Sequence, residues 1–314
     1  MKARDLMAAF AEAGKRVHLI GNLQAGAIIA LDMEGRIFTV LNGQVLNRVN
    51  PAAVAGYNCQ TEYQNPGGDG LWPAPEGTSL GYQYSTGLWR VPPGLRGVRY
   101  LVTDESQRGT IIAGEVDLIN NQGHGVPTIF KRRIKMKSGE NEICLHIRES
   151  ITYIGHRELK RKDCLLAPWT LCQFDSGPEC AVAFPCSVKS SIWDLYDESS
   201  MPQRKWEKNI CHTVTDGSMR YQIALDKKVP WIEFRDPSRN LIVRRSAKNP
   251  PVTQPFIDIR DANPVVPPSK KGVRYSVYSD TAKFMEIEAV GGSPKSVVPG
   301  AEMHIDVTTR FRIE

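Results

Sequence analysis

The feature that most constrains the fold is a succession of short strand-like segments that starts near residue 17 and runs to the C-terminus. Apolar and polar residues alternate within many of them, as over residues 142–148, and Gly, Pro and Asn turns separate them. Helical spacing is confined mainly to residues 3–13, which end at Gly14. The pattern predicts an all-β chain that forms a large β-sandwich preceded by a short N-terminal helix.

The length of the chain and the segments between its strands indicate how many domains it forms. The chain has 314 residues, which is long for one compact domain, but large all-β sandwiches reach this length as a single unit. A Pro-rich stretch over residues 249–268 is flanked by strand patterns on both sides, so we expect it to be a crossover inside one sandwich. We therefore predict a helical extension over residues 1–16 and one sandwich domain over residues 17–314.

Charge is spread along the chain, with a modest net charge of +6. Its densest cluster comprises Lys131, Arg132, Arg133, Lys135 and Lys137, which we expect on the exposed face of a strand or hairpin. No recognition helix or aromatic–basic module accompanies the cluster, so we expect no nucleic-acid partner. No run approaches the roughly 18 apolar residues that cross a bilayer, so we expect no membrane partner.

The cysteines indicate a reducing compartment. Seven are present, an odd number, and none forms a Cys-x-x-Cys pair. We therefore expect reduced, mostly buried thiols and no zinc site, and no cofactor is indicated. The N-terminal residues lack the uninterrupted apolar run of a signal peptide, so the expected location is the cytoplasm.

The most informative candidate site is an acidic strand over residues 284–289. Glu286 and Glu288 share one face of it, while Met285, Ile287 and Ala289 share the other. Carboxylates two residues apart stand about 6 to 7 Å from each other along a strand, close enough to share a polar ligand. An acidic face is also typical of a strand that is exposed to solvent on one side.

Three blocks of sequence together resemble one family. They are the turn at Gly35 and Arg36, a loop over residues 67–76 with the order Gly-Gly-Asp-Gly-Leu-Trp-Pro-Ala-Pro-Glu, and the acidic strand followed by residues 298–300 (Val-Pro-Gly) and a closing strand. Together they resemble the galactose-mutarotase-like (aldose 1-epimerase) superfamily, most closely a branch with a Gly-Gly-x-x-Leu-Trp-x-x-Pro signature. The resemblance extends from about residue 17 over nearly the whole chain.

This resemblance implies a β supersandwich of the galactose-mutarotase type that binds a sugar in a cleft. Aldose epimerases of the family interconvert anomers by acid–base catalysis: a carboxylate takes the proton of the anomeric hydroxyl, and an acid protonates the ring oxygen so that the ring opens. The alignment places the catalytic carboxylate at Glu288, with Glu286 as its neighbour in the site.

The acid of the family is usually a His on a mid-chain strand. The corresponding stretch here spans residues 165–174, with Trp169 and Thr170 where that His would fall. Two functions therefore remain open, an aldose 1-epimerase-like enzyme and a carbohydrate-binding module without chemistry. Glycosidase or lyase chemistry fits less well, because glycosidase carboxylates usually face each other from separate strands.

Further residues are candidates for binding the sugar. Trp72 and Trp169 could stack on the apolar face of a pyranose ring. Asp258 and Asp261 lie in the crossover and could reach the cleft. His304 alternates with Asp306 on the terminal strand, which we expect to pair near Glu288. Arg36 and His212 complete the set of proposed substrate-binding residues.

Overall fold

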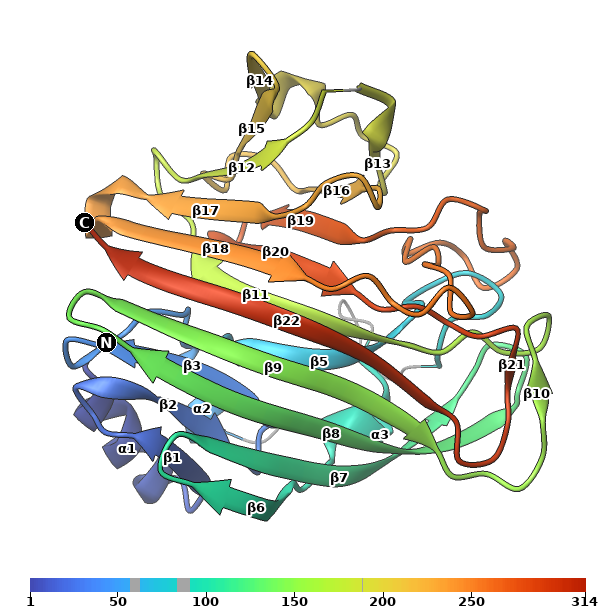
Figure 1. Ribbon diagram of the computed structural model, residues 1–314, viewed down its shortest axis with the longest axis horizontal. Coiled ribbons are helices and arrows are strands. Elements are labelled where there is room, and N and C mark those ends of the chain that lie inside the picture. The colour runs from blue at the N-terminus through green and yellow to red at the C-terminus, as the bar shows by residue number, and fades with distance from the viewer. Residues whose placement is uncertain (57–62, 84–90, 188) are drawn as a thin grey trace.

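Two large antiparallel β-sheets stacked face to face form the protein (Figure 1). The computed structural model describes residues 1–56, 63–83, 91–187 and 189–314. Within these residues each large sheet contains ten strands, and side chains from both sheets build one continuous hydrophobic core. The predicted all-β sandwich with a short N-terminal helix is confirmed.

The first sheet contains the acidic strand near its centre. Its spatial order is β1 (Val17–Gly21), β2 (Ala25–Ala30), β3 (Arg36–Leu41), β5 (Asp69–Ala74), β11 (Ala167–Asp175), β20 (Phe284–Val290), β19 (Tyr275–Asp280), β16 (Tyr221–Leu225) and β13 (Ile192–Asp194), with β4 (Gln44–Val45) paired to β3. The acidic strand is β20, and β11 and β19 flank it. Every residue of β20 is buried.

The second sheet covers one face of the first (Figure 1). Its spatial order is β14 (Arg204–Glu207), β15 (Ile210–Val214), β12 (Ala181–Pro185), β17 (Ile232–Asp236), β18 (Leu241–Ala247), β22 (Glu302–Ile313), β9 (Glu142–Tyr153), β8 (Gly125–Ser138), β7 (Gly109–Ile119) and β6 (Leu101–Ser106). A separate two-stranded sheet joins β10 (Leu159–Lys160) to β21 (Ser296–Val297). The terminal strand β22 pairs with β18 and β9, so the expectation that it pairs near Glu288 is wrong.

Helices are short and peripheral. They are α1 (Ala3–Glu12), α2 (Pro51–Ala55), α3 (Pro93–Arg96) and the 3-10 turns η1 (Lys189–Ser191), η2 (Met201–Gln203) and η3 (Pro237–Arg239). Leu6 and Phe10 of α1 join a second, smaller apolar cluster with Ile28 of β2 and Phe38 of β3. The N-terminal helix therefore packs against the first sheet through its apolar stripe. None of the helices in the described part of the chain is long and apolar enough to cross a membrane.

The Pro-rich stretch leads from β18 of the second sheet to β19 of the first, which confirms the predicted crossover. Asp258 stabilises this segment from within, because its carboxylate accepts hydrogen bonds from the backbone N–H of Arg260 and of Ser269. The crossover also brings Asp261 to the side of the first sheet on which the acidic pair lies.

One part of the basic cluster is not exposed. On β8 the inward and outward residues alternate, so Lys131, Arg133 and Lys135 face outward while Arg132 faces the interior and is fully buried. The prediction that the whole cluster lies on an exposed face is therefore wrong for Arg132. Successive side chains of a strand point to opposite faces, so a strand that covers a core with one face buries every second side chain.

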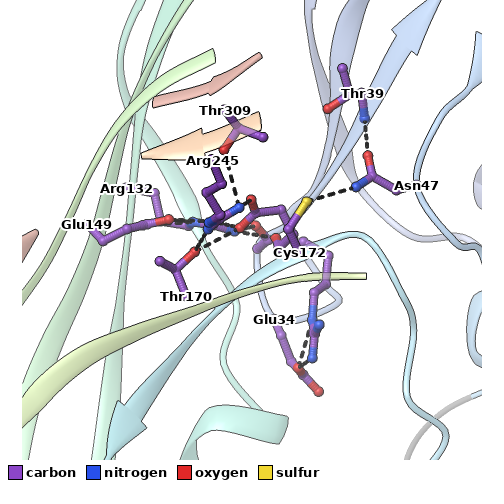
Figure 2. Close-up of polar contacts among 12 residues, drawn as sticks. Glu34, Thr39, Asn47, Arg132, Glu149, Thr170, Cys172, Arg245 and Thr309 are labelled. Atoms are coloured by element: carbon purple, nitrogen blue, oxygen red, sulfur yellow. Dashed lines mark hydrogen bonds and ion pairs between the residues drawn. The ribbon is translucent and has the colours of Figure 1, made fainter. Parts of the chain in front are cut away.

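Buried Arg132 belongs to an ion network between the sheets (Figure 2). Its guanidinium contacts Asp69 at 3.0 Å and Glu149 at 2.6 Å, and Arg245 contacts Asp69 at 2.6 Å. Thr170 donates a hydrogen bond to Asp69. Two guanidinium groups thus balance two carboxylates, which is the condition under which charges are tolerated in a protein interior.

The thiols agree with the expectation from the sequence within the described residues. Six cysteines there are free and buried: Cys144, Cys164, Cys172, Cys180, Cys186 and Cys211. The seventh, Cys59, lies outside the described residues.

Candidate functional site

A small cavity lies over the centre of the first sheet. In the described residues it is lined by carboxyl, aromatic and amide side chains, namely Trp72, Glu76, Trp169, Leu171, Tyr196, Arg220, Gln222, Asp261, Tyr278, Glu286 and Glu288. Its volume is about 30 Å³, roughly the share of one liquid water. It combines apolar walls, two buried carboxyls and several polar atoms, the usual composition of a small-molecule site.

Glu288 forms the floor of the cavity and is completely buried. Its position on a central strand fixes it between Leu171 of β11 and Ser276 of β19. The indole N–H of Trp169 donates to Oε2 of Glu288 at 3.0 Å, and the amide of Gln222 donates at 3.2 Å. Two neutral donors therefore orient the carboxyl.

Glu286 lies beside Glu288 and is only 5% exposed. The amide of Gln173 donates to Oε1 of Glu286 at 2.6 Å. Glu286 and Glu288 stand at alternate positions of β20, so their side chains point to the same face and line the same cavity. Since two neighbouring buried carboxyls cannot both ionise freely, the pair titrates as a unit and not as two independent carboxylates.

Burial shifts the ionisation of both groups in the same direction. Burial raises the pKa of Glu288 well above its ordinary value, and the charge of Glu286 raises it further. Burial also raises the pKa of Glu286, but the interaction with Glu288 and the positive charge of Arg36 oppose that rise. The protonated form is therefore favoured in this pair more than in exposed carboxyls.

Two tryptophans form an aromatic wall beside the carboxyls. The rings of Trp72 on β5 and Trp169 on β11 meet edge to face, with 6.0 Å between centroids and 88° between planes. Their strands are paired, and the two residues stand directly opposite each other. The buried indole N–H of Trp72 has no hydrogen-bond partner among the described residues, so a ligand acceptor in the cavity could satisfy it.

An arginine and two tyrosines stand at the mouth of the cavity. Arg220 lies over the rings of Tyr196 and Tyr278, at 4.6 and 5.7 Å from their centroids. It also donates hydrogen bonds to both phenol oxygens, at 3.1 and 3.0 Å. Asp280 accepts a hydrogen bond from Tyr278 and lies 3.7 Å from the Arg220 guanidinium. Arg220 thereby links the two tyrosines across the mouth.

The structure brings together five of the residues proposed from the sequence: Glu286, Glu288, Trp72, Trp169 and Asp261 line one cavity. Arg36 does not line it. Its buried guanidinium pairs with Glu34 at 2.7 Å and lies 5.8 Å from the Trp72 ring centroid, so it supports the cavity wall from behind. Asp258 does not line the cavity either, since it holds the crossover backbone, whereas Asp261 does.

The two proposed histidines lie elsewhere. His212 is on β15 and His304 is on β22, both in the second sheet, where they stand 3.9 Å from Glu207 and Glu302 respectively. Neither lines the cavity, and neither does any of the other four histidines of the chain. In the described residues, no group of three or more His, Cys, Asp or Glu side chains is arranged to hold a metal ion.

Reasoning from the sequence missed several lining residues, among them Gln222, Tyr196, Arg220 and Tyr278. One signal was present: Gln222 is the single amide in the otherwise apolar or aromatic strand β16. The mouth residues gave no comparable signal, because Tyr196 and Arg220 lie outside regular strands and meet only through the tertiary fold.

Comparisons with known proteins identify the fold. No protein-family model matches the sequence, and no curated protein matches it. Among solved structures, Slr1438 from Synechocystis sp. PCC 6803 is similar with a TM-score of 0.60 and 12% identity, over 95% of this chain and 96% of that one. A galactose mutarotase-like protein from Lactobacillus casei has a TM-score of 0.58 and 11% identity, over 95% and 100%. A galactose mutarotase related enzyme from Lactobacillus acidophilus has a TM-score of 0.56 and 12% identity, over 95% and 100%.

These likenesses cover nearly the whole chain at very low identity. They show that the chain has the galactose-mutarotase-like sandwich fold, which confirms the resemblance inferred from the sequence at the level of the fold. Because a fold of this kind can carry different activities, function has to be argued from the cavity itself.

Proposed function

We propose that the protein binds a carbohydrate in this cavity and interconverts its anomers, as an aldose 1-epimerase does. The observation that carries the proposal is the meeting of two buried carboxyls with two tryptophans in one cavity of a mutarotase-like sandwich. Pyranose rings present apolar C–H faces to aromatic rings, and their hydroxyls hydrogen-bond to carboxyl and amide groups. The substrate class is a free sugar or sugar derivative.

Glu288 is the residue to which we assign the base. In its ionised form it would take the proton of the anomeric hydroxyl, the C1–ring oxygen bond would break as the ring oxygen gains a proton, and rotation before ring closure would give the other anomer. Trp169 and Gln222 would hold the carboxyl in place during this exchange, since both donate to it.

The cavity is small relative to a sugar. A volume of about 30 Å³ is much smaller than a pyranose ring, so we expect the mouth to widen when a sugar binds. The cavity walls near the floor belong to central strands, whereas Tyr196 and Arg220 at the mouth lie outside strands and Arg220 is half exposed. We expect the mouth to move and the floor to stay in place.

A binding protein without chemistry is the second candidate, and one observation favours it. None of the chain's six histidines lines the cavity, so the usual acid of epimerases has no equivalent of the same residue type there. Such a protein would keep the aromatic wall and the amide donors and would bind a sugar without accelerating anomer exchange.

The free, buried thiols support a reducing compartment, so we also propose that the protein acts in the cytoplasm.

Exchange spectroscopy by NMR tests the proposed function. Anomer exchange is measured for a panel of free aldoses and sugar phosphates with the wild-type protein, with Glu288→Gln and with Glu302→Gln, an exposed control on the second sheet. Faster exchange that is lost in Glu288→Gln but kept in Glu302→Gln supports the epimerase. Binding by calorimetry without faster exchange supports the binding protein. Neither binding nor exchange with any sugar would refute both.

A further inference from the structure

We propose that Glu286 and Glu288 share one proton and together supply both the base and the acid of the reaction, which makes Glu286 a second catalytic residue. This inference rests on the proposed function, because it assigns roles in the same cavity. It also provides an acid in a cavity that no histidine lines, since the acid would be a carboxyl of the pair.

The first support is the position of the two side chains. They stand at alternate positions of one strand, point to the same face, are both buried and line the same cavity. A single ligand on that face can therefore contact both carboxyls at once. The two oxygens that exchange protons during anomer interconversion, the hydroxyl oxygen and the ring oxygen, are bonded to the same carbon.

The second support is the absence of a direct cationic partner. Within the described part of the chain, the donors to the pair are Trp169, Gln222 and Gln173, all of them neutral, and no Lys, Arg or His forms an ion pair with either carboxyl. Arg36 acts on Glu286 only through its charge, because its hydrogen bonds go to Glu34, Tyr63 and a backbone carbonyl.

Two buried carboxylates with neutral donors alone would repel each other in a medium of low polarity. Retaining one proton removes that repulsion and allows a hydrogen bond between them. The positive charge of Arg36 favours the ionised form of Glu286. Because the proton can pass between neighbouring carboxyls, either one can start a cycle as the base.

The chemistry balances with one proton on the pair. The ionised carboxylate takes the proton of the anomeric O–H bond, and the electron pair of that bond forms the C=O of the open-chain aldehyde. The C1–ring oxygen bond breaks, its electrons go to the ring oxygen, and the protonated carboxyl gives its proton there. The pair again holds one proton. After rotation about the C1–C2 bond, the same steps in reverse close the ring on the other face.

Matched amide variants test the proposal. We expect Glu286→Gln and Glu288→Gln each to lower the rate of anomer exchange by about 100-fold or more, and the double variant to lose little beyond that, because the two groups act as a unit. The wild-type rate should fall on both the acid and the alkaline side of an optimum, because the pair must hold one proton. A Glu286→Gln protein that keeps its rate within about threefold of wild type would overturn the shared role while leaving the epimerase intact.

A second measurement does not depend on activity. Infrared spectroscopy of the wild-type protein at neutral pH should show the C=O band of a protonated carboxylic acid, and the band should lose intensity in Glu288→Gln. Absence of this band from the wild-type protein, or an unchanged band in Glu288→Gln, would overturn the shared proton. If the band is present and no sugar exchanges faster, the shared proton stands as a property of the cavity, and its catalytic role fails together with the proposed function.

Discussion

The molecule contains two sets of buried carboxyls that are neutralised in different ways. Asp69 and Glu149 lie between the sheets and contact the guanidinium groups of Arg132 and Arg245. Glu286 and Glu288 lie on the same sheet, two strands from Asp69, and have neutral donors. The network is balanced by fixed cations, whereas the pair is balanced by a proton.

The pKa values of Asp69 and Glu288 shift in opposite directions, while burial raises the pKa of Glu149 at the edge of the network. Burial alone would raise the pKa of Asp69, but the charges of Arg245 and Arg132 bring it below its ordinary value. Burial raises the pKa of Glu288, and its closest charged neighbour, Glu286, raises it further. A balanced ion network resists ionisation changes near neutral pH, whereas a carboxyl pair that holds a proton can exchange it with a ligand.

The largest expected effect comes from breaking the network. Asp69→Asn leaves Arg132 and Arg245 without a shared counter-charge, so the free energy of unfolding should fall by about 3–5 kcal/mol, measured by urea denaturation at neutral pH. In the wild type the contribution of Asp69 is present above its unfolded pKa and is lost as the pH falls through its lowered folded pKa.

Asp175→Asn is the matched control for this variant. Asp175 pairs with Arg48 at 3.0 Å, but 61% of its side chain is exposed. Its loss should change the free energy of unfolding by less than about 1 kcal/mol. Equal effects of Asp69→Asn and Asp175→Asn would refute the claim that the interior network differs from a surface ion pair.

Glu288→Gln should have the opposite effect on stability. Glu288 has a raised folded pKa, so its contribution is present below its unfolded pKa and is lost as the pH rises through the folded value. The amide can still donate to Glu286 and accept from Trp169, and it cannot ionise. We therefore expect the variant to be more stable than wild type at pH 8, by about 1–2 kcal/mol, with the difference vanishing near pH 4.

Thermal unfolding between pH 4 and pH 9 measures this effect. Asp69→Asn provides the internal comparison, because its deficit should be largest at neutral pH and should shrink on the acid side. A Glu288→Gln protein that is less stable than wild type throughout this range would show that the carboxyl is held ionised, which contradicts the difference between the two sets.

The sequence was sufficient for the fold class, the N-terminal helix, the crossover and the acidic face of β20, because each follows from local periodicity or turn chemistry. It was insufficient where the position of a residue depends on which strands pair. His304 lies away from Glu288 because the terminal strand pairs with β18 and β9, which its own residues do not reveal. The run of neighbouring charges on β8 hides the alternation that buries Arg132. Gln222 and Arg220 joined the cavity only through contacts distant in the chain.

A smaller effect is expected at the aromatic wall. Trp72→Phe removes the buried indole N–H, which has no hydrogen-bond partner in the part of the chain that the structure describes. If a bound sugar satisfies this group, its loss should weaken sugar binding by roughly fivefold, the value of one hydrogen bond of about 1 kcal/mol. Calorimetry measures the change, with Trp231→Phe as a control beside the second sheet, where Arg244 covers the ring. Equal affinities of Trp72→Phe and wild type would show that the N–H does not contact the ligand.

The smallest effect on stability is expected at the mouth of the cavity. There Arg220 and Asp280 form an ion pair that is partly exposed to solvent. Half of the Arg220 side chain is exposed and the two groups are 3.7 Å apart, so Arg220→Ala should change the free energy of unfolding by less than about 1 kcal/mol. The same change removes the link between Tyr196 and Tyr278, so sugar should associate faster in stopped-flow measurements of tryptophan fluorescence. Unchanged association would mean that another part of the cavity limits access. A loss of stability comparable to that of Asp69→Asn would instead mean that Arg220 holds the fold together, as the buried guanidinium groups do.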